Sequence, residues 1–285
     1  MILSACGTMK EPAATPAPAG ALEARTHEDL NAVLWMQTAV EYRASALQAY
    51  HAARVALDAA LADPGETAAI EQTGDFSALP PAVVVDLDET VIDNSAFEAR
   101  LIVDSRPGKP AVYTEAGWGA WIDEEKERPI PGAVEFLDYA RSRGVTPIYI
   151  TNGNAADGGE AATRAALKRL QVPLDAGDAA LLMRGENGWN SPDKGARRAY
   201  AARRYRILLL VGDNFEDFVS VSPNARTVDG RASLAAKYSE RWGTKWIVLP
   251  NPTYGSWEQA VTMGLPSGNE NAALARKYAT LRLDR

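Results

Sequence analysis

The feature of this sequence that most constrains its fold is a series of short apolar segments, which begins near residue 80 and alternates with stretches of helical spacing. Apolar runs of this length are typical of strands that are buried in a parallel sheet. Their alternation with helical segments predicts an α/β fold. The predicted strands are AVVVDLD at 82–88, TPIYITN at 146–152, AALLM at 179–183, RILLLVGD at 206–213 and KWIVLPN at 245–251.

Composition and charge exclude several classes of protein. The 285 residues, 46% hydrophobic and 24% charged, describe a globular chain of one large domain or two small ones. Thirty basic and 37 acidic residues give a net charge of −7, which argues against binding of a nucleic acid polymer. One cysteine, Cys6, and two histidines, His27 and His51, cannot build a disulfide framework or a Cys/His zinc cluster. One group of arginines is interpreted as a solvated helix face: Arg197, Arg198, Arg203, Arg204 and Arg206.

The segment before the first predicted strand has helical periodicity. Thr26 and Asp29 form a start that resembles a capping box, and apolar residues then recur at helical spacing up to Pro64 and Gly65. We therefore expect one long helix or two consecutive helices over residues 27–63, within an N-terminal helical segment at 26–75.

Polar residues of one kind follow three of the predicted strands. The first strand ends in Asp86 and Asp88, the second in Thr151 and Asn152, and the fourth in the segment GDNFED, which contains Asp213 and Asp217. Ligands of open α/β sheets bind outside the carboxyl ends of the strands, so we expect these groups to converge. Lys194 precedes the fourth strand by one helix and can reach the same crevice.

This set of residues indicates chemistry on an anionic substrate. Several carboxylates in one place require a divalent cation and a lysine to offset their charge, or some of them must stay protonated. Oxygen ligands without a nearby histidine favour Mg²⁺ over zinc or copper. A carboxylate that attacks a phosphate monoester is repelled by it, and Mg²⁺, Lys194 and the Thr151 hydroxyl could offset that repulsion. Strand-end turns and helix caps are the structural alternative, but they do not explain two pairs of aspartates together with the lysine.

The order of these motifs resembles that of a known family. DLDET, ITN, a lysine and GDNxxDF resemble the four motifs of the phosphatase branch of the haloacid dehalogenase (HAD) superfamily. The flanking segments LWMQTAVEYRA, VVVDLDETVIDNS, IPGAVEFL and VLPNPTYGSWE are similar to those of class C acid phosphatases, bacterial outer-membrane lipoproteins that include a 5′-nucleotidase. The resemblance runs from about residue 26 to 265. It implies a Rossmann-like HAD core with a parallel sheet, a helical N-terminal layer and an inserted helical cap.

The resemblance also implies a role for each residue of the set. Asp86 would be the nucleophile that forms an aspartyl-phosphate, and Asp88 the general acid and then the base. Asp86 and Asp213 would supply carboxylate ligands to Mg²⁺, Asp88 only its backbone carbonyl, and Asp217 would lie close by. Thr151 and Lys194 would hold the phosphoryl oxygens. The implied catalytic residues are thus Asp86, Asp88, Thr151 and Lys194, and the implied metal site is Asp86, Asp88, Asp213 and Asp217.

Aromatic residues suggest what the leaving group is. Tyr113 and Trp118 lie between the first two motifs, where superfamily members insert specificity elements, and Tyr254 follows the last strand. Aromatic walls beside a phosphate site suit a nucleobase or a nicotinamide ring. Asn94 and Asn152 are further candidate substrate-binding residues. Gly153 stands where relatives often carry an arginine, so preference for the leaving group could differ here.

The first residues contain a lipoprotein-like motif. Leu3, Ser4, Ala5 and Cys6 match the pattern that bacterial lipoprotein signal peptidase cleaves before a lipidated cysteine, although the basic and apolar segments that precede it in signal peptides are missing. We therefore expect a translation start further upstream or a trimmed chain, with lipidation of Cys6 and an unmodified terminal cysteine as the alternative. The Pro/Ala-rich segment that follows reads as an extended tether.

The sequence thus predicts an Mg²⁺-dependent acid phosphatase on small phosphomonoesters, 5′-nucleotides among them, that works at mildly acidic pH. We expect a lipid anchor as its membrane contact, a place in the bacterial cell envelope at the outer membrane, and a homodimer as one possible assembly. The alternatives are a phosphotransferase using the same site and a non-catalytic ligand-binding lipoprotein. The expected organisation is a lipobox remnant at 1–6, a tether at 7–25, a core at 76–265 with a cap at about 95–130, and a C-terminal helix at 266–285.

Overall fold

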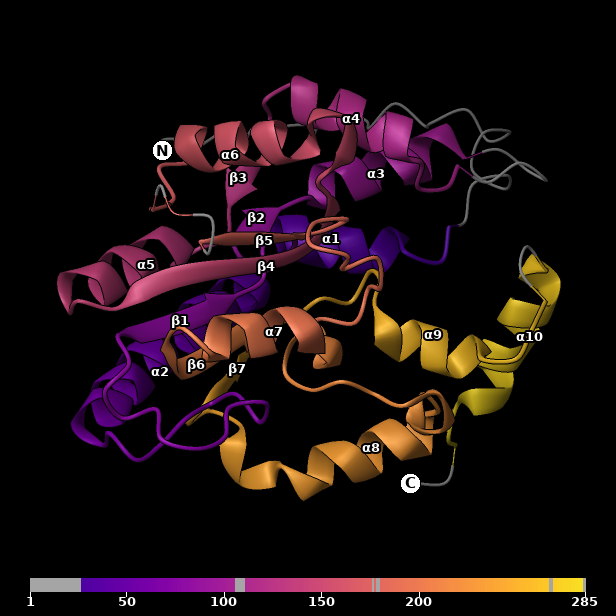
Figure 1. Ribbon diagram of the computed structural model, residues 1–285. Helices are drawn as coiled ribbons and strands as arrows, with labels where there is room; N and C mark the ends of the chain where they lie inside the picture. Colours follow the sequence, from indigo (N-terminus) through magenta and orange to yellow (C-terminus); the bar gives the residue numbers. More distant parts are fainter. Residues whose placement is uncertain (1–26, 106–110, 176, 178–179, 267–268, 284–285) are drawn as a thin grey trace, which may run out of the picture.

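A five-stranded parallel sheet forms the centre of the molecule (Figure 1). The computed structural model describes residues 27–105, 111–175, 177, 180–266 and 269–283. All five predicted strands are present, and the predicted α/β fold is confirmed. The strands lie in the order β5-β4-β1-β6-β7, and their bounds are Pro81–Val85 (β1), Thr146–Asn154 (β4), Leu181–Arg184 (β5), Arg206–Gly212 (β6) and Trp246–Val248 (β7).

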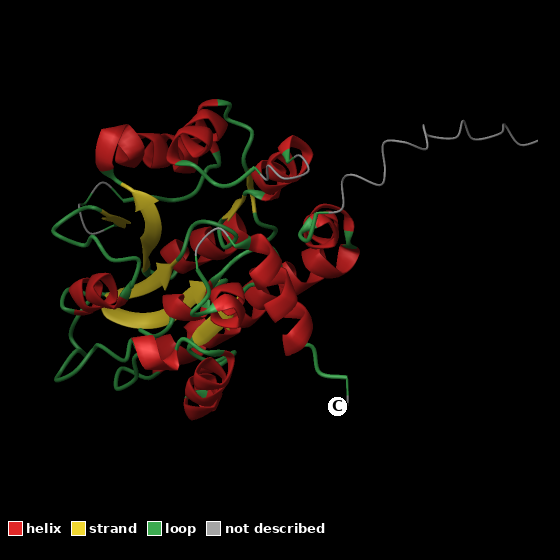
Figure 2. Ribbon diagram, turned by 90° about the vertical axis from the view of Figure 1, so that its right-hand side faces the viewer, coloured by secondary structure: helices red, strands yellow, loops and turns green. Residues whose placement is uncertain are grey.

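Both faces of the sheet are buried, which explains why its strands are apolar at nearly every position. Successive side chains of a strand point to opposite faces. Val83 and Val85 of β1 therefore belong to one core cluster, in which helices α2 (Val40–Ala62) and α5 (Ala133–Ser142) pack on the sheet. Val84 belongs to a second cluster, which contains residues of α7 (Gly195–Ala202). Figure 2 shows the strands in the centre with helices around them.

Two helices, rather than a single one, fill the predicted N-terminal helical segment. Helix α1 (Leu30–Thr38) ends at Ala39, whose extended backbone also begins α2. Thr26, the expected capping residue, lies outside the described residues. Helix α2 packs on α5 and on β6. The buried Tyr50 of α2 donates a 2.6 Å hydrogen bond to the carbonyl of Thr90, so this layer contacts the loop that follows β1.

A smaller layer lies over the sheet in the region where we expected a cap. It contains α3 (Ser95–Asp104), α4 (Glu115–Asp123) and an antiparallel pair of short strands, β2 (Ile92–Asp93) and β3 (Arg128–Pro129). These elements form the upper part of the molecule in Figure 1, together with α6 (Gly159–Arg169). Helix α4 contacts α6, and α3 contacts α1.

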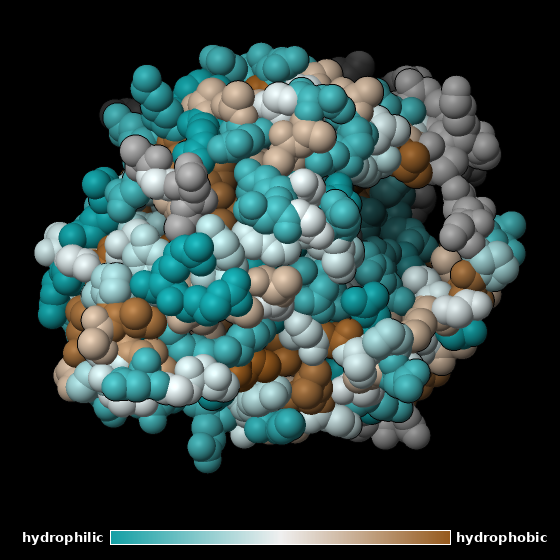
Figure 3. Space-filling model, viewed as in Figure 1, coloured by the Kyte–Doolittle hydropathy of each residue, from teal (hydrophilic) through white to brown (hydrophobic). Residues whose placement is uncertain are grey.

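The remaining elements complete the lower and right-hand parts of Figure 1. Within the described part of the chain, no helix is both long enough and apolar enough to cross a membrane. Figure 3 shows a predominantly hydrophilic face, hollowed between the upper layer and the arm formed by the last two helices. The remaining elements in the lower and right-hand parts are the helices α8 (Val228–Lys237), α9 (Ser256–Thr262) and α10 (Glu270–Thr280), and the 3₁₀ turns Phe215–Asp217, Pro223–Ala225 and Ser239–Arg241. A further 3₁₀ turn, Ala156–Gly158, leads directly into α6 of the upper layer.

The order of the strands fixes where a ligand can bind. From β1 the chain proceeds to β4 and β5 on one side, and then crosses to β6 and β7 on the other side. The switch in direction therefore lies between β1 and β6. In open α/β sheets the crevice at the carboxyl ends of such neighbouring strands is the usual ligand site.

Candidate active site

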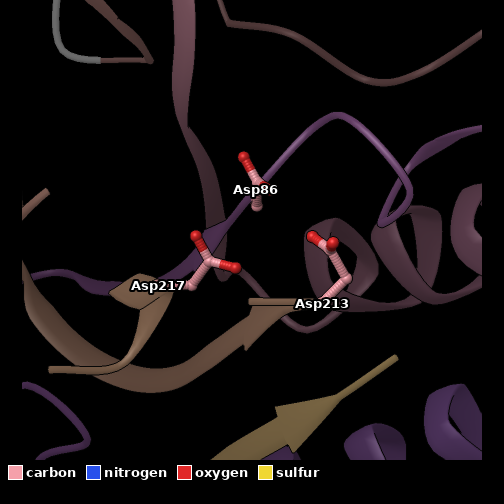
Figure 4. Close-up of side chains that lie close together, drawn as sticks. All are labelled: Asp86, Asp213 and Asp217. Atoms are coloured by element: carbon pink, nitrogen blue, oxygen red, sulfur yellow. The ribbon is translucent and has the colours of Figure 1, made fainter. Parts of the chain in front are cut away.

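Three carboxylates meet at the switch point of the sheet. Asp86 follows β1, whereas Asp213 and Asp217 follow β6. One oxygen atom from each of them lies within 4.8 Å of the others, and Figure 4 shows the three side chains grouped where the two strands end. Their strands pair in parallel register, and the backbone N–H of Asp86 donates a 2.9 Å hydrogen bond to the carbonyl of Val211. The pairing of β1 with β6 thus brings together aspartates that lie more than a hundred residues apart.

Lys194 joins two of these carboxylates. Its Nζ atom donates hydrogen bonds of 2.5 Å to Asp86 Oδ1 and 2.6 Å to Asp217 Oδ1, and the three side chains are all less than 10% exposed. Burial acts against the charge of the lysine, but the carboxylates of Asp217 and Asp86 outweigh it and raise the pKa of Lys194 to about 12. The lysine is therefore charged throughout the physiological pH range.

The other two aspartates have raised pKa values. Burial, with the charges of Asp217 and Asp86, raises the pKa of Asp213 well above its ordinary value, although Asn251 donates a 2.9 Å hydrogen bond to Asp213 Oδ2. Burial raises the pKa of Asp217 to about 6, against the opposing effect of Lys194. One lysine does not balance three carboxylates, so this site favours a further positive charge.

The donor set fits a divalent cation of the magnesium type. Its three carboxylates are close enough to share one ion, and Mg²⁺ and Ca²⁺ prefer oxygen ligands. Neither histidine contributes, because His27 and His51 lie in the N-terminal segment and not in this group. The aspartate cluster is consistent with the metal site of a HAD protein. Asp88, a fourth predicted metal residue, is not a member of this carboxylate group.

Asp88 is held by two neutral side chains. Asn94 Nδ2 donates a 3.0 Å hydrogen bond to Asp88 Oδ1, and Thr151 Oγ1 donates a 3.4 Å bond to Asp88 Oδ2. Burial raises the pKa of Asp88, although these two hydrogen bonds and Lys194 act in the opposite direction. The carboxyl group is thus fixed in place without a direct salt bridge to any described residue.

Thr151 and Asn152 are positioned by Arg197, which the sequence pattern had placed on a solvated helix face. Arg197 donates a 2.5 Å hydrogen bond to the Thr151 carbonyl and a 2.6 Å bond to Asn152 Oδ1. Its side chain is fully buried, so the expectation of a solvated arginine face is wrong here. It is also wrong for Arg198 and Arg206, which are buried. Arg203 and Arg204 are exposed, as expected, but they follow the end of α7 at Ala202. Arg197 follows Lys194 at helical spacing, one turn further along α7. This spacing is the feature of the sequence that indicates a place for Arg197 near the site.

Arg198 supports the loop that carries Asp217. It forms an ion pair with Glu71, at 2.7 Å, and donates hydrogen bonds of 2.9 and 3.0 Å to the carbonyls of Glu216 and Asp217. Its pairing with a residue of the segment before β1 could not be recognised from spacing along the chain. Arg197 and Arg198 therefore donate hydrogen bonds to backbone carbonyls around the site, and neither is a solvent-exposed surface residue.

A pocket of about 120 Å³ opens beside these groups. Two of the five predicted substrate-binding residues, Asn152 and Tyr254, line it. Asn94 is only 1% exposed and lies behind Asp88, so it contacts a catalytic candidate and does not line the pocket. The full lining is Asp86, Asp88, Asn152, Lys194, Asp213, Asn214, Glu216, Asp217 and Tyr254.

Tyr113 and Trp118 form an aromatic cluster in the cap. Their ring centroids lie 6.1 Å apart, and both contact Phe97, at 6.3 and 5.2 Å. Tyr113 is 52% exposed. Neither residue lines the pocket. The charge of Asp88 nevertheless contributes to a raised pKa of the Tyr113 hydroxyl, after burial and Glu115.

The geometry defines a class of enzyme: an aspartate-based phosphohydrolase of the HAD type, with its carboxylates and lysine at the switch point of a parallel sheet. The family model described as HAD superfamily, subfamily IIIB (acid phosphatase) matches residues 5–257. The chain belongs to this family of phosphomonoesterases. The expected family and enzyme class are therefore confirmed.

Solved structures agree with the family match. The chain is similar to the class C acid phosphatase from Bacillus anthracis, with 30% sequence identity and a TM-score of 0.75, over 90% of this chain and 98% of that chain. A structure of class C acid phosphatase from Bacillus anthracis with tungstate bound matches with 30% identity and a TM-score of 0.76, over the same shares of the two chains.

Proposed function

We propose that this protein hydrolyses phosphate monoesters, 5′-nucleotides among them, in a Mg²⁺-dependent reaction through an aspartyl-phosphate on Asp86. The observation that carries the proposal is the buried group in which Lys194 bonds to Asp86 and Asp217 while Asp213 completes a set of three carboxylates. A structure of a similar class C acid phosphatase holds tungstate, which is a tetrahedral oxyanion like phosphate. Family membership and site geometry thus support the same reaction.

In the first step, a carboxylate oxygen of Asp86 attacks phosphorus and the bond from phosphorus to the leaving oxygen breaks. Lys194 holds Asp86 Oδ1, which leaves Oδ2 to attack. Asp88 gives its proton to the leaving oxygen, so that a neutral alcohol departs. The Asn94 and Thr151 side chains keep the Asp88 carboxyl group in place for this transfer.

In the second step, Asp88 takes a proton from water as the water attacks phosphorus. The bond between phosphorus and Asp86 breaks, and phosphate leaves with the carboxylate restored. Mg²⁺, when bound at Asp86 and Asp213, supplies positive charge that stabilises the transferring phosphoryl group. Lys194 and the Thr151 hydroxyl add to this stabilisation. Activity is highest at mildly acidic pH, because Asp88 must be protonated while Asp86 is ionised.

The leaving group is expected to lie against Tyr254, which lines the pocket next to Asn152 and Asn214. Flat aromatic rings stack on tyrosine, so a nucleobase or a nicotinamide ring suits this wall. Tyr113 and Trp118 belong to a cap that could supply a second aromatic wall.

We also propose that Cys6 is lipidated and tethers the protein to the bacterial envelope at the outer membrane. Cys6 lies outside the described residues, and the proposal depends on the four-residue motif that ends there. Mass spectrometry of protein extracted from membranes tests it. A Cys6 without a lipid, in protein expressed from its complete gene, excludes the anchor.

The proposed reaction is tested by phosphate release from AMP, nicotinamide mononucleotide and an aryl phosphate, with Mg²⁺ or with EDTA. We expect release that requires the metal and is lost in Asp86→Asn. Asp138→Asn, a substitution of an exposed aspartate on α5, is the matched control and should retain full activity. Folded wild-type protein that binds AMP but releases no phosphate at any pH would refute the proposal and favour a ligand-binding lipoprotein.

A further inference from the structure

The loop after β1 contains a buried carboxyl group that the reaction does not use. Glu89 follows Asp88 directly and is completely buried. Its backbone φ is +54°, in the left-handed region that glutamate seldom adopts. A strained backbone and a buried acidic side chain both cost free energy, so this position is held by specific contacts.

Both oxygens of the Glu89 side chain accept hydrogen bonds. The backbone N–H of Asn94 donates a 2.8 Å bond to Glu89 Oε1. The Tyr254 hydroxyl donates a bond to Glu89 Oε2. One carboxyl group therefore connects the loop after β1 with the loop after β7, 165 residues further along the chain.

The two partners of Glu89 lie at different places in the site. Asn94 supports Asp88 through its side chain, and Trp121 donates a 3.4 Å hydrogen bond to Asn94 Oδ1. Tyr254 lines the pocket itself. The Asn94 bond fixes the carboxyl group against the protein interior, so that its second oxygen is presented to the hydroxyl of Tyr254.

We propose that Glu89 is a positioning residue that fixes the ring of Tyr254 for stacking on the leaving group and so sets the preference for nucleotides. A tyrosine ring at the mouth of a pocket has rotational freedom, and a bond from its hydroxyl to a buried acceptor removes that freedom before the substrate binds. This inference rests on the proposed function, because the leaving group is taken to be aromatic.

The test compares Tyr254→Phe, Glu89→Gln and the double variant on AMP and on glycerol 3-phosphate, a substrate without a ring. Tyr254→Phe keeps the ring and loses the bond. We expect its KM for AMP to rise about fivefold, as the loss of one hydrogen bond implies, while kcat/KM for glycerol 3-phosphate changes less than twofold. Glu89→Gln should raise the KM for AMP severalfold, and the double variant should be no worse than Tyr254→Phe.

Glu127→Gln is the control for loss of a buried carboxylate. Glu127 is buried and forms an ion pair with Arg169, away from the pocket. This variant should lose stability without any change in the ratio of the two substrates. If Glu89 has only a structural role, Glu89→Gln should also lose stability without a change in the ratio of the two substrates. That result would overturn the inference. An unchanged KM for AMP in Tyr254→Phe would overturn it as well.

Calorimetry of AMP binding to the same variants separates this inference from the proposed reaction. If the wild type releases no phosphate, and if Tyr254→Phe binds AMP more weakly than the wild type does, then the role of Glu89 is supported and the hydrolysis is refuted. Wild-type protein that does not bind AMP refutes the role of Glu89.

Discussion

Removal of the Lys194 charge is the most direct test of how the negative charges of the site are balanced. Lys194→Met keeps the length of the side chain and removes the ammonium group that bonds to Asp86 and Asp217. All three side chains are less than 10% exposed, so the carboxylates cannot recover their hydration. Breaking a buried ion pair by removal of one partner costs about 3–5 kcal/mol. We expect a loss of this size in the free energy of unfolding.

The measurement is urea unfolding at pH 8 in EDTA, where Asp217, with its pKa of about 6, is ionised in the wild type. Lys245→Met is the matched control, because Lys245 pairs with Glu66 at the surface, where the two side chains are 27% and 50% exposed. A surface pair contributes about 0–1 kcal/mol. Phosphate release by Lys194→Met should also fall by about 100- to 1000-fold, the usual effect of removing one stabilising charge from a transition state.

Equal stability losses in the two variants would refute the reasoning. They would mean that the carboxyl groups around Lys194 are already neutral in the folded protein. Mg²⁺ should also restore part of the stability of Lys194→Met, because a cation bound to Asp86 and Asp213 replaces some of the missing charge.

Three further predictions concern residues around the site and in the cap. Burial raises the pKa of Glu98 to about 7, above its unfolded value, so its contribution to stability is present at low pH and is lost as the pH rises through 7. Glu98→Gln should therefore stabilise the protein by about 2–3 kcal/mol at pH 8 and have little effect at pH 4, as measured by urea unfolding. Gly212→Ala would place a methyl group 2.3 Å from Asp217 Oδ2, and the displaced carboxylate should lower kcat/KM about 100-fold, whereas unchanged kinetics would contradict the geometry. Arg197→Met should cost about 1–3 kcal/mol of stability and raise the KM, because the Thr151 carbonyl loses its partner; thermal unfolding and steady-state kinetics check both effects.

The core and the catalytic candidates were largely predictable from local patterns. Five apolar runs gave five strands, since a strand buried on both faces needs apolar side chains at successive positions. The convergence of Asp86 and Asp213 followed from their places at strand ends, because parallel strands present their carboxyl ends at one edge. Lys194 was expected in the same crevice because it lies one helix before the fourth strand, at the start of α7. The lipid anchor and the organisation of the chain before residue 27 stay predictions.

Pairings between distant segments could not be predicted. Arg197 and Arg198 look like surface residues in a basic stretch of sequence, yet both are buried because their partners, Asn152 and Glu71, come from other elements. Periodicity reports whether a position is apolar, and an arginine that is buried because it bonds to distant segments has no such signature.

The sequence by itself determined the parallel α/β sheet, the order of its motifs and the carboxylates at its edge, since each depends on residues that are close together in the chain or on a general rule of parallel sheets. Only the tertiary structure decided which residues support them. Glu89 and Tyr254 are 165 positions apart, and their hydrogen bond depends on how the loops after β1 and β7 are packed. Such contacts arise from the closure of long loops around a common core, and no spacing along the chain encodes them.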